Sequence, residues 1–248
     1  MTRLPIHPPR EAAAPPVVDR VSWQTACDEL LAREKAHTRE GDAIAAARRR
    51  LPMTEIPASA RIVGPAGEMD FIDAFEGRSQ LIGYFHMWHD GNSWDAQCEG
   101  CTFFAGQAQR PEYLHSRDIT MAIFTEGSYE ESKPYADFVH NTLPWYSARG
   151  ATDVVAGRPF GFIACYLRRG DRVFETYWCT GRGTEALAWS YALMDRSVYG
   201  RQEDWEDSPD GWPREIATRG EQFRVAGRPT IQWRYTDEPV TADAGPCH

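Results

Sequence analysis

The 248-residue sequence lacks the features that mark several specialised classes of protein. No apolar run approaches the roughly 20 residues that a membrane-spanning helix requires. The first residues, Met1 to Pro5, do not begin the apolar core of a signal peptide. Positive charge is also scarce, because 27 Lys and Arg stand against 36 Asp and Glu and leave a net charge of −9. A basic stripe that could neutralise phosphates is therefore missing. These absences predict a cytoplasmic protein with no membrane and no nucleic acid among its partners.

Cysteine occurs only six times, at positions 27, 98, 101, 165, 179 and 247. That number and the irregular spacing exclude the dense disulfide framework of a small secreted domain, so we expect mostly reduced thiols. The sequence also contains no GxGxxG fingerprint, no phosphate-binding P-loop and no Ser-His-Asp arrangement. The nucleotide-binding and serine-nucleophile classes therefore receive no support.

What the sequence does contain is a pair of cysteines, Cys98 and Cys101, separated by two residues. The apolar and aromatic segment 81–88 precedes them and predicts a buried strand, followed by a polar loop over 89–97. Residues 102–108 can continue as a helix. The N-terminus of a helix favours a thiolate over a thiol, and the CxxC spacing lets the second sulfur resolve a mixed disulfide with the first. We therefore predict Cys98 as the exposed nucleophile and Cys101 as the resolving thiol.

The charges around this pair are unfavourable for a thiolate. Glu99 lies between the cysteines and Asp95 lies three residues before them, and both carboxylates oppose ionisation of the thiol. A nearby cation is needed, for which His89, His115 and Arg117 are the candidates.

A metal site is the alternative hypothesis. His86, Met87 and His89 lie just before the cysteines, and thiolate, imidazole and thioether ligands select copper or zinc. In this alternative His89, Cys98, Cys101 and His115 hold the metal, whereas the main hypothesis requires no cofactor. A structural zinc site usually needs a second pair of ligands, and no second CxxC exists here. A third hypothesis is an interaction protein that keeps the fold and binds partners through its aromatic surface.

The chain divides into four predicted parts. Residues 1–20, rich in proline, form an extended arm, and residues 21–58 form an N-terminal helical extension in which Cys27 packs into the core. Residues 59–198 form the main domain, and residues 199–248 form a C-terminal extension and tail. The acidic segment 202–210, which includes Trp205, is predicted to be an ordered loop or a docking surface.

The main domain has a readable order of elements. A hairpin over 61–71 turns at 64–67, and the central strand and the CxxC helix follow. A second buried strand over 118–124, a helix over 130–141, a hairpin over 161–178 and a last helix over 184–193 complete it. The predicted fold class is α/β, a thioredoxin-like fold in which helices flank a central mixed sheet and the CxxC lies where a strand ends.

Several longer motifs carry a family resemblance. They are Met87-Trp88-His89, Gln97-Cys98-Glu99-Gly100-Cys101-Thr102, Pro144-Trp145-Tyr146-Ser147 and the run from Tyr199 to Pro209. The chain resembles, over roughly residues 22–215, a bacterial thioredoxin-like family of unknown function (DUF899-type) whose members are predicted dithiol-disulfide oxidoreductases. The resemblance implies a thioredoxin-like fold and a dithiol at Cys98 and Cys101. Thioredoxin-like enzymes usually place a cis-proline opposite the CxxC, for which Pro144 and Pro159 are candidates, and His86 and Cys179 depart from the family pattern.

The partners follow from the main hypothesis. We expect a protein or a small-molecule thiol or disulfide as the reaction partner, and a homodimer because of the proline-rich arm and the aromatic C-terminal region. Trp88, Trp94, Trp145 and Tyr146 are the predicted substrate-binding residues, although such aromatic side chains are more often core or subunit interface.

Overall fold

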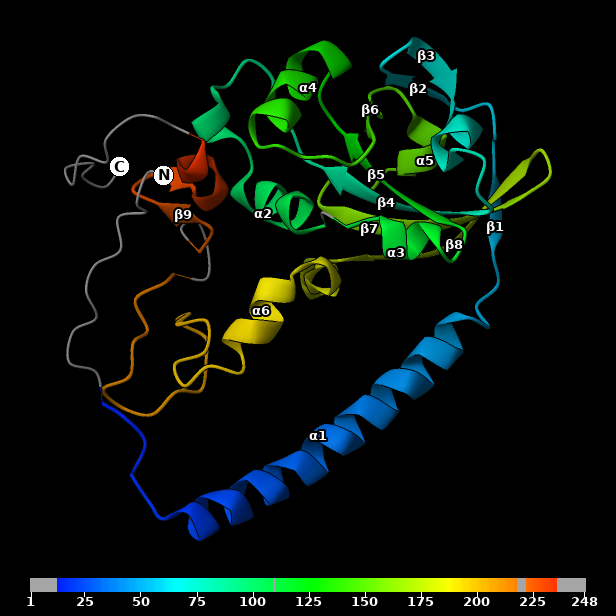
Figure 1. The fold of residues 1–248 in the computed structure, drawn as a ribbon. Coiled ribbons are helices and arrows are strands. Elements are labelled where there is room, and N and C mark those ends of the chain that lie inside the picture. Colours follow the sequence, from blue (N-terminus) through cyan, green and yellow to red (C-terminus); the bar gives the residue numbers. More distant parts are fainter. Residues whose placement is uncertain (1–12, 109, 218–221, 236–248) are drawn as a thin grey trace.

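A twisted sheet of eight strands forms the centre of the molecule in the computed structural model, which describes residues 13–108, 110–217 and 222–235 (Figure 1). The strand order is β1-β8-β7-β4-β5-β6-β2-β3. The strands are β1 (Thr54–Ile56), β2 (Arg61–Gly64), β3 (Gly67–Asp70), β4 (Gln80–His86), β5 (Ile119–Thr125), β6 (Trp145–Ser147), β7 (Phe162–Arg169) and β8 (Arg172–Thr180).

Strand β4 lies in the middle because its side chains are apolar on both faces. Five of its seven residues are buried, which is the pattern of a strand covered on both sides. It pairs in parallel with β5, from Gln80 opposite Ile119 to His86 opposite Thr125, and antiparallel with β7. The parallel pairing places the ends of β4 and β5 at the same edge of the sheet.

Helices and 3-10 helices pack on both faces of this sheet (Figure 1). Leu81 and Phe85 face a core that includes residues of segments 71–75 and 152–155, whereas Tyr84 faces helical residues of segments 99–107 and 129–138. The helices are α1 (Arg20–Arg48), α2 (Glu99–Gln107), α3 (Glu112–His115), α4 (Tyr129–Phe138), α5 (Thr152–Val155) and α6 (Trp189–Met194). The 3-10 helices are η1 (Phe71–Phe75), η2 (Trp94–Ala96), η3 (Gly181–Leu187) and η4 (Thr230–Arg234), and a small second sheet joins β9 (Arg224–Val225) to β10 (Arg228–Pro229).

The connectivity confirms the predicted fold class. From β4 the chain passes through α2 to the parallel strand β5, then through α4 to the short parallel strand β6, and after α5 into the β7–β8 hairpin, η3 and α6. The strand, CxxC helix, strand, helix, hairpin and helix therefore follow one another as predicted, with helices on both faces of a mixed sheet. The chain has a thioredoxin-like fold.

Helix α1 departs from the prediction. It is one continuous helix of 29 residues without a buried side chain, and Figure 1 shows it running apart from the sheet. The prediction that Cys27 packs into the core is therefore wrong, since Cys27 is only partly covered and neighbouring Leu30 and Leu31 are exposed. Asp19 begins the helix by accepting hydrogen bonds from the N–H groups of Val21 and Ser22.

Other predictions receive smaller corrections. The last helix is interrupted at Ala188, which separates η3 from α6. The described residues contain no cis peptide bond, so neither Pro144 nor Pro159 is a cis-proline, and Gly161 is the residue directly before β7. No helix of the described segments has the length and hydropathy to cross a membrane. Most of the proline-rich arm, residues 1–12, and Cys247 lie outside the described residues.

Candidate functional site

The loop that carries the CxxC leaves the sheet at the end of β4 and is held by one buried amide. Gln97, which is fully buried, accepts a hydrogen bond from the N–H of His89 at 2.9 Å. Its side-chain amide donates to the carbonyls of His89 and Asn92 at 2.9 and 3.2 Å. A buried side chain that satisfies three backbone groups fixes the path of the loop. Cys98 therefore enters α2 from a defined direction.

Cys98 is the N-cap residue of α2, and its sulfur accepts the backbone N–H of Cys101 at 3.5 Å. The pKa of Cys98 is lowered to about 6, chiefly by a hydrogen bond from the Cys101 thiol and against the effect of burial. The backbone N–H groups of Cys101 and Gly100 and the charge of His89 lower this pKa further. The helix terminus thus stabilises the thiolate of Cys98.

Cys101 has the opposite character. It is 3% exposed, and the N–H of Met87 donates to its sulfur at 3.3 Å. Its pKa is raised well above the ordinary value, first because its thiol donates to Cys98 and then because it is buried. A hydrogen bond with Tyr84 of β4 lowers the pKa of Cys101, but this effect is smaller than the two that raise it. The two cysteines therefore differ in acidity: the pKa of Cys98 is lowered and that of the buried Cys101 is raised.

A cation from the far end of the described chain neutralises Glu99. Arg224 on β9 forms an ion pair with Glu99, and both side chains are less than a fifth exposed. The same guanidinium donates to the carbonyl oxygens of Asp95 and Gln97 at 2.6 and 3.0 Å. The carboxylate between the cysteines consequently lies in a compensated environment. Nothing in the sequence around the CxxC indicates this partner.

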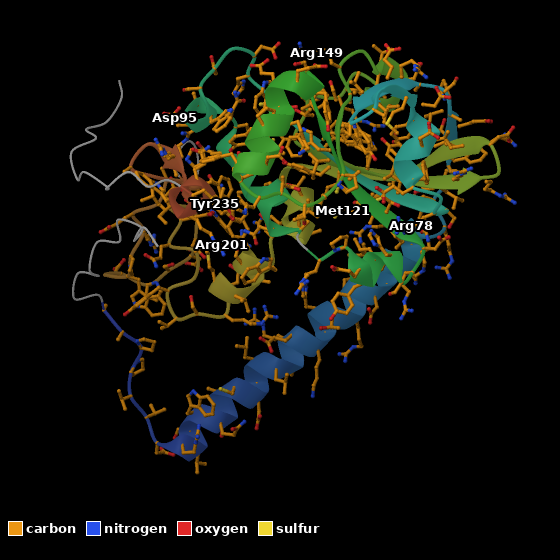
Figure 2. The ribbon with its side chains drawn as sticks, turned by 45° about the horizontal axis from the view of Figure 1, so that its top comes forward. Arg78, Asp95, Met121, Arg149, Arg201 and Tyr235 are labelled. Carbon is orange, nitrogen blue, oxygen red and sulfur yellow. The ribbon has the colours of Figure 1, made fainter. Side chains whose placement is uncertain are left out.

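Of the cations predicted for this task, only His89 acts on Cys98. His115 and Arg117 precede β5, whose first residue, Ile119, pairs with the first residue of β4. They therefore lie at the opposite edge of the sheet, about 20 Å from the end of β4 at 3.3 Å per residue. Figure 2 shows this separation: Arg78, which precedes β4, lies far from Asp95, which follows it.

The proposed metal ligands are not assembled. Within the described segments, no three His, Cys, Asp or Glu side chains are placed to hold one metal ion. His89 lies near the cysteines, whereas His115 lies at the far edge of the sheet. The predicted set of His89, Cys98, Cys101 and His115 is therefore wrong as a single site. The parallel pairing of β4 with β5 separates His115 from the other three residues, although they are close in sequence.

His86, the unexpected residue at the end of β4, is 1% exposed, and neither ring nitrogen has a hydrogen-bond partner among the described residues. Its ring lies 5.3 Å from that of Trp145 and 6.4 Å from that of Trp88. Burial lowers its pKa to about 4. His86 is therefore a neutral core residue at neutral pH.

A cavity of about 630 Å³ opens beside the two cysteines. The CxxC end of α2 forms one wall, Gly161 and Thr180 at the ends of β7 and β8 form another, and Phe223 closes a third. The far wall contains Tyr191 of α6 and the segment from Arg201 to Trp205. This volume falls in the usual range of small-molecule sites. Cys98 therefore lies beside an open cavity whose lining combines aromatic rings with charged and small polar residues.

The four predicted substrate-binding residues lie elsewhere. Trp88, Trp145 and Tyr146 are at most 5% exposed and belong to the core, while Trp94 stacks on Phe138 at 4.9 Å. None of them lines the cavity beside the cysteines. Among the residues that line this cavity, Glu203 and Trp205 belong to the acidic segment that the sequence singled out. Tyr191 and Phe223 were not predicted, because only the folded chain brings them to α2.

Comparison with known proteins identifies the family of the chain. The family described as "Bacterial protein of unknown function (DUF899)" matches residues 12–237, which is most of the chain. The chain belongs to this family. No curated protein matches this DUF899 protein.

Among solved structures, this DUF899 protein is similar to a putative thiol:disulfide interchange protein DsbE from Chlorobium tepidum, with 14% identity and a TM-score of 0.34 over 58% of this chain and 93% of that one. It is also similar to peroxiredoxin Q from Xanthomonas campestris, with 12% identity and a TM-score of 0.37 over 56% of this chain and 96% of that one. The apo Sco1 protein of Thermus thermophilus has 11% identity and a TM-score of 0.35 over 56% and 90%. Identities this low concern the fold alone, which the strand order already establishes.

Proposed function

We propose that this protein is a thiol-disulfide oxidoreductase in which Cys98 is the nucleophile and Cys101 the resolving thiol. The observation that carries the proposal is the division of the pair. The pKa of Cys98 is lowered to about 6 at a helix N-terminus, while Cys101, buried behind it, keeps a raised pKa. Two buried structural thiols would both have raised pKa values, as Cys165 does at about 11.

The chemistry proceeds in two exchange steps. The Cys98 thiolate attacks one sulfur of a disulfide, forms a mixed disulfide and releases the other sulfur as a thiolate. Cys101 then loses its proton and attacks the Cys98 sulfur, which releases the second thiolate and leaves a Cys98–Cys101 disulfide. The protein dithiol gives up two electrons and the substrate disulfide gains them. The reverse sequence oxidises a substrate dithiol.

The surroundings also favour the second step, in which Cys101 resolves the mixed disulfide. When Cys98 enters the mixed disulfide, the hydrogen bond from the Cys101 thiol to the Cys98 thiolate is lost, and with it the main cause of the raised pKa of Cys101. Formation of the mixed disulfide therefore makes Cys101 easier to ionise when its thiolate is needed. Arg224 keeps the charge of Glu99 from opposing either thiolate.

The test is single-turnover disulfide reduction by the pre-reduced protein, with Cys98→Ser, Cys101→Ser and, as a matched control, Cys165→Ser. We expect Cys98→Ser to abolish the reaction, Cys101→Ser to accumulate one mixed disulfide per chain, and Cys165→Ser to react as the unaltered protein does. Unchanged turnover in Cys98→Ser would refute the proposal. So would one copper or zinc per chain, in protein purified without chelator, with both thiols blocked to alkylation.

A further inference from the structure

The wall of the cavity opposite Cys98 carries both signs of charge. Arg182, Glu185, Arg201 and Glu203 all line it. Figure 2 shows Arg201 on the same side of the molecule as Asp95 of the CxxC loop. Which charge remains available to a bound molecule depends on how these four side chains pair with one another.

Both arginines are committed to carboxylates. Arg201, which is 8% exposed, donates twice to Asp195 at 2.8 Å and once to Glu185 at 3.2 Å. Arg182 pairs with the same Glu185 at 2.9 Å. The charges of these two guanidinium groups and two carboxylates cancel in sum, and Arg201 is buried within its own pairs.

Glu203 is the carboxylate that remains. It is 4% exposed and accepts hydrogen bonds from two neutral donors, the hydroxyl of Tyr191 at 3.2 Å and the indole N–H of Trp205. The ion pairs of the described residues do not include Glu203. A buried carboxylate whose side-chain donors among the described residues are neutral favours a cation in the space beside it.

The rest of the lining suits the same kind of group. Phe104 and Phe223 contribute aromatic rings to the cavity, and their faces attract ammonium groups. The thiolate of Cys98 adds a second negative charge, which would repel a carboxylate on the substrate. Aromatic faces with one unbalanced carboxylate are the chemistry of an organic ammonium site.

We infer that the cavity selects a small disulfide that carries an ammonium group, with Glu203 as the residue that determines this specificity. The inference rests on the proposed function. The Cys98 thiolate attacks a sulfur of the small disulfide while Glu203 holds the ammonium group, and one ammonium-bearing thiolate leaves. Cys101 resolves the mixed disulfide and releases the second thiolate, so that two electrons pass from the protein dithiol to the small molecule.

The experiment compares three small disulfides that differ in charge: cystamine, which is cationic, hydroxyethyl disulfide, which is neutral, and dithiodipropionate, which is anionic. Each single-turnover rate with the reduced full-length protein is divided by the rate with free mercaptoethanol, which corrects for the reactivity of the reagent. We expect cystamine to exceed the neutral disulfide by about tenfold and dithiodipropionate to be slowest. Glu203→Gln should remove most of this order, whereas Glu130→Gln, an exposed change of the same charge on α4, should keep it.

A second variant tests the inference independently, in case Glu203→Gln does not fold. Thr180 is exposed at the edge of the cavity, so Thr180→Lys adds a cation there without a change in the core, and it should slow cystamine and accelerate dithiodipropionate. Equal corrected rates, a fastest anionic disulfide, or an order that both Glu203→Gln and Thr180→Lys leave intact would overturn the inference and leave the proposed function standing. Failure of all three disulfides to oxidise Cys98 would instead refute the proposed function.

Discussion

Replacing Cys101 by alanine should make Cys98 a much weaker acid. The first cause of the low pKa of Cys98 is the hydrogen bond from the Cys101 thiol, and burial alone acts in the opposite direction. Cys101→Ala removes that donor and leaves the backbone N–H groups of residues 100 and 101. Cys101→Ser keeps a hydroxyl donor at the same place and is the matched control.

The magnitude follows from the pKa of about 6. At about pH 6.5, roughly three quarters of Cys98 is then a thiolate. If the pKa rises to about 7.5 or higher in Cys101→Ala, the thiolate share at that pH falls to about a tenth. Alkylation of Cys98 should therefore slow by about eightfold near pH 6.5. The difference should disappear above about pH 9, where Cys98 is ionised in both proteins.

The assay is the pH profile of iodoacetamide alkylation, with the Cys98 peptide quantified by mass spectrometry so that the other thiols do not contribute. Cys165, whose pKa is raised to about 11 by burial, provides an internal reference that stays unmodified over most of this range. An inflection for Cys101→Ala that stays near pH 6 would refute the reasoning. It would show that the helix terminus and His89 alone set the acidity of Cys98.

Three further outcomes are expected. The pKa of His86 is about 4 in the folded protein, against 6.5 for a free histidine. The free energy of unfolding should therefore be highest above about pH 6.5 and fall by about 3 kcal/mol as the pH drops toward 4, because the unfolded chain binds the proton more tightly. His86→Phe should flatten this part of the pH profile of urea unfolding. Arg224→Gln should raise the alkylation inflection of the nucleophilic thiol by about half to one pH unit, and Glu99→Gln in the same chain should restore it. Arg158→Ala removes the two hydrogen bonds of 2.9 and 2.6 Å that the 7%-exposed carboxylate of Glu175 accepts, so the free energy of unfolding in urea should fall by about 3 kcal/mol. A loss below about 1 kcal/mol would contradict the buried pairing.

The central part of the fold could be predicted because its signals are local. The apolar run of β4 and that of β5 each indicate a buried strand, and the turn at 64–67 between β2 and β3 contains two glycines and a proline. The CxxC at the end of β4 follows from the same strand boundary. These features depend on neighbours along the chain, and the sequence shows those directly.

The parts that could not be predicted depend on distant contacts. The apolar stripe of α1, with Leu30 and Leu31, has the same spacing whether or not another element covers it. His115 is close to the cysteines in sequence, yet the parallel pairing of β4 with β5 carries it to the other edge of the sheet. Arg224 pairs with a glutamate 125 positions earlier, a separation at which one sequence gives no pairing signal.

The C-terminal segment that packs on α2 has a consequence for the order in which a nascent chain matures. Phe223, which stacks on Phe103 at 4.5 Å, and Arg224, which pairs with Glu99, are synthesised long after the two cysteines whose surroundings they complete. Gln232, which donates to the carbonyl of Trp94 at 2.8 Å, comes later still. A ribosome-bound chain can fold β4, α2 and β5 while the thiol pair still lacks one wall of its cavity and the counterion of Glu99. The surroundings of the thiol pair are therefore complete only after Gln232 has been synthesised.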